Sequence, residues 1–222
     1  MKPLLETILS RKLADVRRPA IYKWLDEHNI KNYTLNDRGE IDVDGSVDLS
    51  YKDIEEFPPF IQFGVVKGYF SCSNSKLTSL KGSPKKVNGS FYCQNNKLTS
   101  LEGAPREVKG SFDCSCNYLT SLEWVPAKVG GGFDCAHNDL TSLKGAPEKI
   151  KEYFDCGSNN IEDLKGAPKV VGGYFDCGNN NLTSLKGSPK AVGGNFFCNS
   201  NIAQFTEEDV MRVCRVINNI YV

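Results

Sequence analysis

The sequence predicts an α/β-type solenoid, in which short turns of the chain stack on one another and share one hydrophobic interior. Two observations lead to this prediction. A phenylalanine stands two residues before each of seven cysteines, and a leucine or isoleucine stands five residues after nearly all of them. The cysteines themselves follow at a constant step of 21 residues: Cys72, Cys93, Cys114, Cys135, Cys156, Cys177 and Cys198. Such a step is typical of repeats that bury their apolar sides only against their neighbours.

Each turn begins with a predicted strand. In one turn Val87, Gly89, Phe91 and Cys93 occupy alternate positions, and a period of two indicates a short strand with one buried face. We expect the strands of successive turns to form one parallel sheet, with neighbours about 4.8 Å apart. The chain then returns through a pair of leucines and, in most turns, a glycine followed two residues later by a proline. This composition predicts a tight return without a helix.

The string from Phe91 to Leu101, Phe-Tyr-Cys-Gln-Asn-Asn-Lys-Leu-Thr-Ser-Leu, resembles the leucine-rich-repeat core, with phenylalanine and cysteine in two leucine slots. The 21-residue step and the proline-bearing return are similar to the short bacterial subclass of that family. Arrays of this kind occur in bacterial effectors and in bacteriophage-encoded proteins. The resemblance covers residues 43 to 222, and it implies a right-handed superhelix with one curved parallel sheet, whose concave face meets partners.

The same resemblance implies a structural role for one asparagine of each turn. In the family, asparagines at this slot form a buried ladder that bonds the backbone of adjacent turns. Ser75 takes the slot in the first turn, so we expect that turn to be looser. The ladder residues in this sequence are Asn96, Asn117, Asn138, Asn159, Asn180 and Asn201.

The two ends of the chain depart from the repeat, and we expect them to cap it as parts of one continuous domain. Residues 1–42 form the N-terminal cap, residues 43–205 the array and residues 206–222 a C-terminal cap of one helix and a last strand. Thr206 begins the last helix as its N-cap, with Val210, Val213 and Cys214 facing the core. Helical spacing also occurs at Leu4, Leu5, Ile8, Leu9 and Leu13 and at Ile21, Trp24, Leu25 and His28, before a hairpin turn at Asp37-Arg38-Gly39. A partner-binding role for the two N-terminal helices is the alternative.

The cysteine column allows three interpretations, which are packing, disulfide bonding and metal binding. As packing, each thiol is a small hydrophobic group that points inward. Neighbouring cysteines about 5 Å apart satisfy the Cα separation of a disulfide, but seven in a column cannot all pair. A linear column also offers no tetrahedron of ligands to zinc. We therefore favour packing in a reducing compartment, with Cys116 as a more exposed thiol outside the column.

The outward residues of the predicted sheet give the candidate binding site. Four aspartates fall in register one residue before the cysteines, where like charges about 4.8 Å apart repel one another. One explanation is duplication of the repeat with its aspartate, screened by solvent and salt. The other is a stripe that binds a basic partner, with aromatic residues as anchors. The stripe and its flanking residues are Tyr69, Tyr92, Asp113, Asp134, Tyr153, Asp155, Tyr174, Asp176 and Phe197, with His137 beside them.

The return segments carry most of the lysines, and we read them as a solvated surface. They lack the interleaved aromatic residues on which nucleic-acid bases stack, and the formal net charge of the chain is zero. We therefore do not expect a nucleic-acid partner. Trp124 replaces a return glycine and is a second, weaker candidate for partner contact. Packing of its ring against a neighbouring turn is the alternative.

The composition excludes most enzymatic chemistry. The two histidines, His28 and His137, form no recognisable pair with a nucleophile. There is no phosphate-binding or metal-binding motif, so we expect no catalytic residue, cofactor or metal ion. No apolar run is long enough for a membrane helix, and Glu6 interrupts the apolar N-terminus too early for a signal peptide. These features favour the cytoplasm of a bacterium or of a phage-infected cell.

Together these features predict a non-enzymatic protein-binding module that uses the concave sheet face, encoded by a phage or bacterium and acting on a host protein. The alternative function is a structural or assembly component, such as an accessory protein of a virion. Mass spectrometry of purified particles would separate these two functions. The oligomeric state is not predicted.

Overall fold

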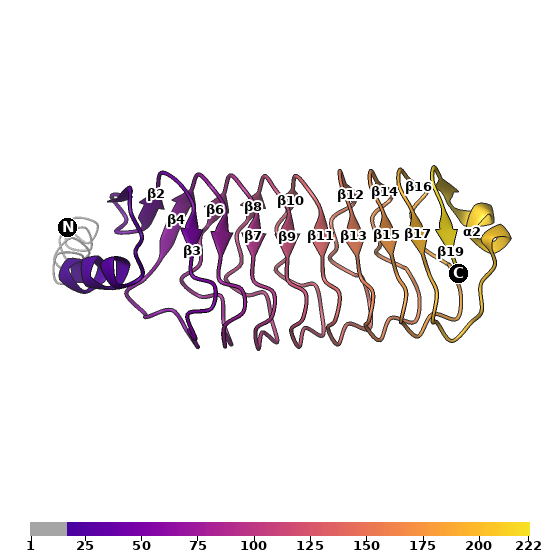
Figure 1. The fold of residues 1–222 in the computed structure, drawn as a ribbon, viewed down its shortest axis with the longest axis horizontal. Helices are drawn as coiled ribbons and strands as arrows, with labels where there is room; N and C mark the ends of the chain where they lie inside the picture. The colour runs from indigo at the N-terminus through magenta and orange to yellow at the C-terminus, as the bar shows by residue number, and fades with distance from the viewer. Residues whose placement is uncertain (1–16) are drawn as a thin grey trace, which may run out of the picture.

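The structure, a computed structural model, describes residues 17–222 and shows a β-solenoid whose turns stack in a nearly straight row (Figure 1). Residues 17–27 form a helix at one end of the row. The helix α2 (Glu207–Val213) lies at the other end. The helix predicted around Leu4 to Leu13 falls outside the described residues. Within the described part, the turns between these ends contain strands and bends but no helix.

One parallel sheet runs along the whole row and takes one strand from each turn. Its order is β19-β17-β15-β13-β11-β9-β7-β5-β3, with all neighbours parallel. Phe133, for example, pairs with Phe112 on one side and with Phe154 on the other. The strands are β3 (Val47–Asp48), β5 (Phe70–Ser71), β7 (Phe91–Tyr92), β9 (Phe112–Asp113), β11 (Phe133–Asp134), β13 (Phe154–Asp155), β15 (Phe175–Asp176), β17 (Phe196–Phe197) and β19 (Ile220–Tyr221).

Each turn contributes a second short strand, so the prediction of one sheet is wrong. These strands form a six-stranded sheet, β1-β2-β4-β6-β8-β10, and a four-stranded sheet, β12-β14-β16-β18. Of these strands only β1 and β2 pair antiparallel, and they form the hairpin predicted around Arg38. The strands are β1 (Tyr33–Leu35), β2 (Ile41–Val43), β4 (Phe63–Val66), β6 (Lys86–Val87), β8 (Glu107–Val108), β10 (Lys128–Val129), β12 (Lys149–Ile150), β14 (Val170–Val171), β16 (Ala191–Val192) and β18 (Arg215–Val216).

A glycine corner divides the segment that was expected to be one strand. Between β6 and β7 the chain bends at Gly89, whose equivalents in the adjacent turns are Gly68 and Gly110. A Cβ atom on Gly89 would lie 2.7 Å from the carbonyl carbon of Gly68. Glycine is therefore needed at this corner because the backbones of successive turns approach closely there.

Glu152 occupies this corner position in one turn, and the second sheet breaks there. In the preceding turn Gly131 donates its backbone N–H to Gly110, and in the following turn Gly173 donates to Glu152. A Cβ on Gly131 would approach the backbone nitrogen of Ser111 to 2.9 Å. The side chain of Glu152 therefore separates its turn from the one before it, which accounts for the missing pairing between β10 and β12.

The core repeats the same contacts from turn to turn. Consecutive phenylalanine rings from Phe70 to Phe175 stack nearly parallel, with centroids 5.5 to 5.7 Å apart. Each column cysteine is buried, and the Cys156 thiol donates to the backbone oxygen of Asp176 at 3.1 Å. All nine cysteines are free thiols, and Cys116 is the one that is partly exposed. Packing is thus the role that the column cysteines have in the structure.

The asparagine ladder joins each turn to the one before it. The amide oxygen of Asn138 accepts the backbone N–H of Leu119 at 2.9 Å. Its amide nitrogen donates to the carbonyl oxygens of Cys114 and Cys135, both at 3.1 Å. The same contacts recur from Asn96 to Asn201. Ser75 is too short to make them, and its buried hydroxyl has no hydrogen-bond partner.

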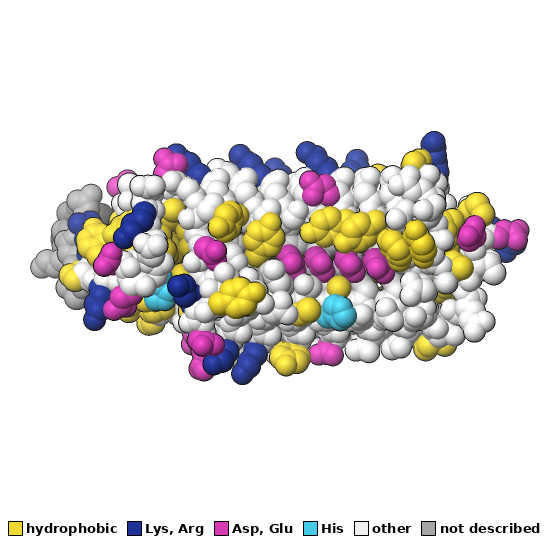
Figure 2. Space-filling view, viewed as in Figure 1, with side chains coloured by type: hydrophobic (Ala, Val, Ile, Leu, Met, Phe, Trp, Pro, Cys, Tyr) yellow, Lys and Arg dark blue, Asp and Glu magenta, His cyan; other side chains and the backbone are white. Residues whose placement is uncertain are grey.

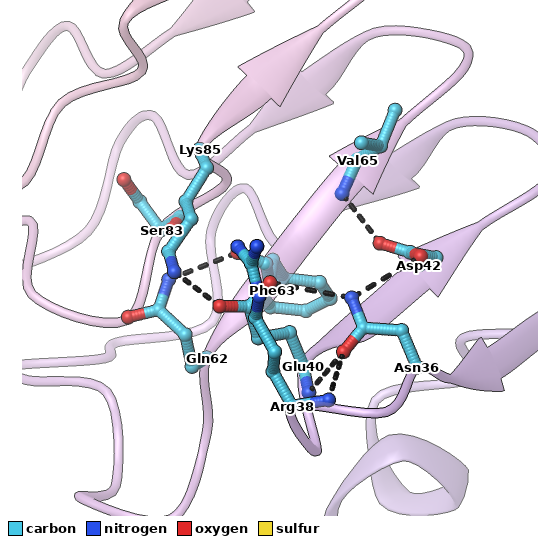
Figure 3. Close-up of polar contacts among 9 residues, drawn as sticks. All are labelled: Asn36, Arg38, Glu40, Asp42, Gln62, Phe63, Val65, Ser83 and Lys85. Carbon is cyan, nitrogen blue, oxygen red and sulfur yellow. Dashed lines mark hydrogen bonds and ion pairs between the residues drawn. The ribbon is translucent and has the colours of Figure 1, made fainter.

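A polar network fastens the N-terminal hairpin to the first turns (Figure 3). Asp42 accepts the backbone N–H of Val65 at 2.7 Å, where the pairing of β2 with β4 shifts register. Asn36 donates to the carboxylates of both Asp42 and Glu40, and Lys85 pairs with Glu40 from a later turn. Burial alone would raise the pKa of Glu40, but the hydrogen bonds from Lys85 and Asn36 leave that pKa below its ordinary value. This carboxylate is therefore ionised and holds the hairpin in place.

The C-terminal end agrees with the sequence in its strands and differs in one side chain. Val216 pairs in register with Val192, and Ile220 pairs with Phe196. Thr206 caps α2 and forms a capping box with Asp209. Val210 and Cys214 are buried as predicted, but Val213 is 44% exposed. The prediction for Val213 is wrong because α2 ends at Val213 and the backbone is already extended at Cys214, so the two side chains do not share one helical face.

Candidate functional site

The candidate site is the outer face of the nine-stranded sheet, and its central feature is a row of carboxylates. Asp113, Asp134, Asp155 and Asp176 are direct register partners on four adjacent strands. Figure 2 shows the four side chains, which we call the acidic row, along the long axis of the molecule. All four are half-buried. The structure therefore brings together the charges that the sequence placed in one stripe.

The local backbone holds each carboxylate in the same orientation. The Oδ1 atom of Asp134 accepts the backbone N–H of Ala136 at 3.0 Å, and that of Asp155 accepts from Gly157 at 2.9 Å. Asp113 and Asp176 make the equivalent bonds to residues 115 and 178. Among residues 17–222, none of the ion pairs between a lysine or arginine and a carboxylate involves the acidic row. Its charges are therefore fixed in place without a neutralising cation from these pairs.

Burial and mutual repulsion both oppose ionisation of the row. Burial, followed by the charge of Asp113, raises the pKa of Asp134 to about 7. Burial, with a smaller contribution from the charge of Asp176, raises the pKa of Asp155 to about 6. The pKa values of Asp113 and Asp176, at the two ends, are also raised by burial. The largest shifts thus fall on the two inner carboxylates, which have a charged neighbour on both sides.

A cluster of aromatic rings lies beside the acidic row. Tyr153 and Tyr174 stack with their centroids 5.2 Å apart, and Phe197 packs edge-on against Tyr174. Phe197 also stacks on Tyr221 at 4.6 Å. We call Tyr153, Tyr174, Phe197 and Tyr221 the aromatic cluster. Figure 2 shows apolar side chains in a second row along the acidic one.

The ring of Tyr153 lies close to Gly132 of the preceding turn, where a side chain would displace it. A Cβ atom on Gly132 would lie 2.3 Å from this ring. Burial, followed by the charges of Asp134 and Asp113, raises the pKa of Tyr153 to about 12. Tyr153 is therefore a neutral phenol at physiological pH, with its ring next to the carboxylates.

The remaining predicted residues lie at the margins of this face. Tyr69 and Tyr92 form a separate pair near the N-terminal end, with ring centroids 6.4 Å apart. His137 is exposed in the loop after β11, at a left-handed backbone position with φ 54°. Its charge lowers the pKa of Asp155, but that effect is smaller than the effect of burial. His137 thus adjoins the acidic row without belonging to the strand face.

Tyr221 is the residue of the site that the sequence analysis missed. It is the register partner of Phe197, so it continues the column of the acidic row by one more turn. The sequence carries a signal for it, because Ile220 and Val222 alternate as Phe196 and Cys198 do, which places Tyr221 in the slot of Phe197. Asp48 begins the same column at the other end, but its register partner is Ser71, so it has no charged neighbour there.

Trp124 stands apart from this face and has a costly backbone conformation. Its φ is 69°, whereas Gly103 and Gly145 hold the same slot in the adjacent turns. A Cβ atom on Gly103 would lie 2.7 Å from the backbone of Leu80 in the turn before it. The Trp124 side chain is nevertheless 63% exposed. Left-handed backbone is unfavourable for residues other than glycine, so this tryptophan adds strain and gains little burial.

Replacing Trp124 with glycine should therefore raise the free energy of unfolding by about 1 kcal/mol, because relief of the left-handed strain exceeds the entropy cost of glycine. Thermal unfolding would report a melting temperature about 2–4 °C higher. Trp124→Ala is the matched control, since it removes the ring but keeps the Cβ atom and its strain. A lower melting temperature for Trp124→Gly would mean that the indole ring stabilises the neighbouring turn.

Neither a metal-binding cluster nor a membrane helix is found in the described part of the chain. Residues 17–222 contain no group of three or more histidine, cysteine, aspartate or glutamate side chains that could hold a metal ion. They also contain no helix that is long and apolar enough to cross a membrane. The nine-stranded sheet face is therefore the site on which the charged and aromatic side chains converge.

Comparison with known proteins gives no relative from which a function could be transferred. No family model matches the chain, and no curated protein and no solved structure matches it.

Proposed function

We propose that this chain is a non-enzymatic protein-binding module, and that the outer face of the nine-stranded sheet binds a partner with a basic surface. The observation that carries the proposal is the acidic row, which none of the lysine and arginine ion pairs of the described residues neutralises, beside the aromatic cluster. The four carboxylates oppose one another in register, and like charges in that position destabilise a sheet. Cationic side chains of a partner would offset this repulsion.

The aromatic cluster supplies the second part of a binding surface. Tyrosine and phenylalanine give a large contact area with few rotatable bonds, and they are typical anchors of protein interfaces. Tyr153 and Tyr174 also lie close to the carboxylates, whose charges help to raise the pKa of Tyr174. An arginine could therefore contact a ring and pair with an aspartate at once.

We propose the leucine-rich-repeat type, in its short bacterial subclass, for the solenoid itself. The asparagine ladder supports this assignment, since it bonds adjacent turns at the slot that the resemblance implies. The nine free thiols support a reducing compartment, which is consistent with the cytoplasm of a bacterium or of a phage-infected cell.

An affinity experiment tests the proposed function. The wild-type chain, the double variant Asp134→Lys/Asp155→Lys and the control Glu102→Lys/Glu123→Lys are immobilised and exposed to a bacterial lysate. Both double variants change the net charge equally, but the control changes exposed residues of the return segments. We expect the wild type and the control to capture the same basic protein, and the acidic-row variant to lose it. Equal capture by all three chains, with unchanged circular dichroism, would refute the proposal.

A further inference from the structure

The acidic row has a fixed spacing that restricts which chain can bind along it. Adjacent strands of a sheet lie about 4.8 Å apart, and the four aspartates occupy consecutive strands. A ligand that runs along the solenoid therefore meets carboxylates at multiples of about 4.8 Å. Alternate carboxylates, such as Asp113 and Asp155, are about 9.6 Å apart by the same spacing.

An extended β-strand does not match these distances. Side chains on one face of a strand repeat at about 6.7 Å, which lies between one step and two steps of the row. An α-helix rises about 4.5 Å over three residues, but each such step turns the side chain by about 60° away from the row. The closest repeats of these conformations are about 10.5 Å over seven residues of a helix and about 13.4 Å over four residues of a strand, each about 1 Å from a multiple of the row's spacing.

The polyproline II conformation does match. It has three residues per turn and rises about 3.1 Å per residue, so every third side chain lies on the same face at about 9.3 Å. That repeat differs from two steps of the row by only about 0.3 Å. Two cationic side chains three residues apart would thus meet Asp113 and Asp155, or else Asp134 and Asp176.

The aromatic cluster fits the other residues of such a chain. Proline-rich segments in this conformation dock on grooves lined by aromatic rings. The stacked rings of Tyr153 and Tyr174, at 5.2 Å, adjoin the acidic row over the same turns that carry Asp155 and Asp176. The carboxylate Oδ1 atoms already accept backbone N–H groups, so a cation would approach the remaining oxygen.

We infer that the partner of this face is a proline-rich segment in the polyproline II conformation, with an arginine at every third position. Its arginines pair with alternate aspartates of the acidic row, and its prolines pack on Tyr153 and Tyr174. This inference rests on the proposed function and adds the conformation of the partner to it. A basic partner in any other conformation would agree with the proposed function but not with this inference.

Two synthetic peptides of identical composition test the conformation and the spacing. One carries three arginines at every third position in a proline background, and the other carries them at every second position. Binding is measured by calorimetry at pH 8 and low salt, where the row is ionised. We expect the first peptide to bind about tenfold more tightly, because it alone aligns two arginines with two carboxylates.

Two double variants with the same change of charge test the register on the protein side. Asp113→Asn/Asp155→Asn leaves Asp134 and Asp176, which are still two steps apart, and should weaken binding of the first peptide only about twofold by removing one of two equivalent registers. Asp134→Asn/Asp155→Asn leaves no pair at that distance and should weaken binding about tenfold, as one aligned pair is lost. Asparagine can still accept the backbone N–H groups, so folding should be preserved, and circular dichroism checks it.

The outcomes separate this inference from the proposed function. Equal affinity of the two peptides, or equal loss in the two double variants, would overturn the register and leave the proposed function standing. Failure of both peptides to bind would also overturn the inference, whereas the lysate experiment would still decide whether a basic protein binds. The proposed function itself fails only if charge reversal leaves capture unchanged.

Discussion

Replacing Asn138 with alanine should lower the free energy of unfolding by about 3–5 kcal/mol. The substitution removes the acceptor for the buried N–H of Leu119 and the donor to the carbonyl oxygens of Cys114 and Cys135. Each buried polar group that loses its partner costs about 1–3 kcal/mol. Since Asn138 bonds its own turn to the preceding one, losing its hydrogen bonds weakens the contact between the two turns as well as the turn that contains Asn138. Urea unfolding followed by circular dichroism measures the effect.

Asn160→Ala is the control for this measurement. Asn160 is exposed and lies one residue after the ladder position of its turn, so its replacement should change stability by less than about 0.5 kcal/mol. Asn201 is only partly buried, so the loss of stability in Asn201→Ala should lie between the losses in Asn138→Ala and Asn160→Ala. If Asn138→Ala and Asn160→Ala unfolded at the same urea concentration, the ladder would not be what joins the turns.

The second large effect concerns pH. The pKa of Asp134 in the folded chain is about 7 and that of Asp155 is about 6, both above the value of about 3.9 expected in the unfolded chain. A carboxyl group whose pKa is higher in the folded chain than in the unfolded chain stabilises the fold in its protonated form. This stabilisation is complete at a pH below the unfolded pKa, and it is lost as the pH rises through the folded pKa. The wild type should therefore lose stability as the pH rises from about 4 to about 7. Asp134→Asn should be more stable than the wild type at pH 8 by about 1–2 kcal/mol.

Asp48→Asn is the matched control for the pH experiment. Asp48 makes the same bond to the backbone N–H two residues on, with Ser50 as donor, and its register partner is the uncharged Ser71. The difference between Asp134→Asn and the wild type should shrink from pH 8 to pH 5. At pH 8 Asp48→Asn should not be more stable than the wild type, because it relieves no repulsion between register partners. Parallel curves for Asp134→Asn and the wild type would show that the carboxylates do not repel one another.

The sequence was sufficient to predict what depends on the 21-residue step. That step places equivalent residues of adjacent turns side by side, so it predicted the acidic row and the phenylalanine column, whereas the asparagine ladder was implied by the resemblance to leucine-rich repeats. The sequence also predicts a looser first turn, where Ser75 replaces the ladder asparagine, and the unpaired hydroxyl of Ser75 agrees with this prediction. These features depend only on register, which a constant repeat length determines.

The sequence was not sufficient where two backbones approach each other. Gly89 occupies an alternate position, so the period of two predicts it within a strand, although it forms the corner between two sheets. Glycine is needed at this corner because a Cβ atom there would lie too close to the backbone of the adjacent turn. The periodicity of the sequence does not reveal such a close approach. The break at Glu152 has the same origin. Its departure from glycine was visible in the sequence, but its effect on the pairing of β10 with β12 required the structure.

The central claim is that four carboxylates crowd one another on a paired sheet and that this makes the face a receptor for cations. Carbon-13 NMR of the aspartate carboxyl groups measures it directly, residue by residue, as the pH is raised from 3 to 9. We expect Asp134 to titrate near pH 7 and Asp155 near pH 6, and addition of the peptide with an arginine at every third position should lower both values. Ordinary values near 4 for all four aspartates would contradict the account.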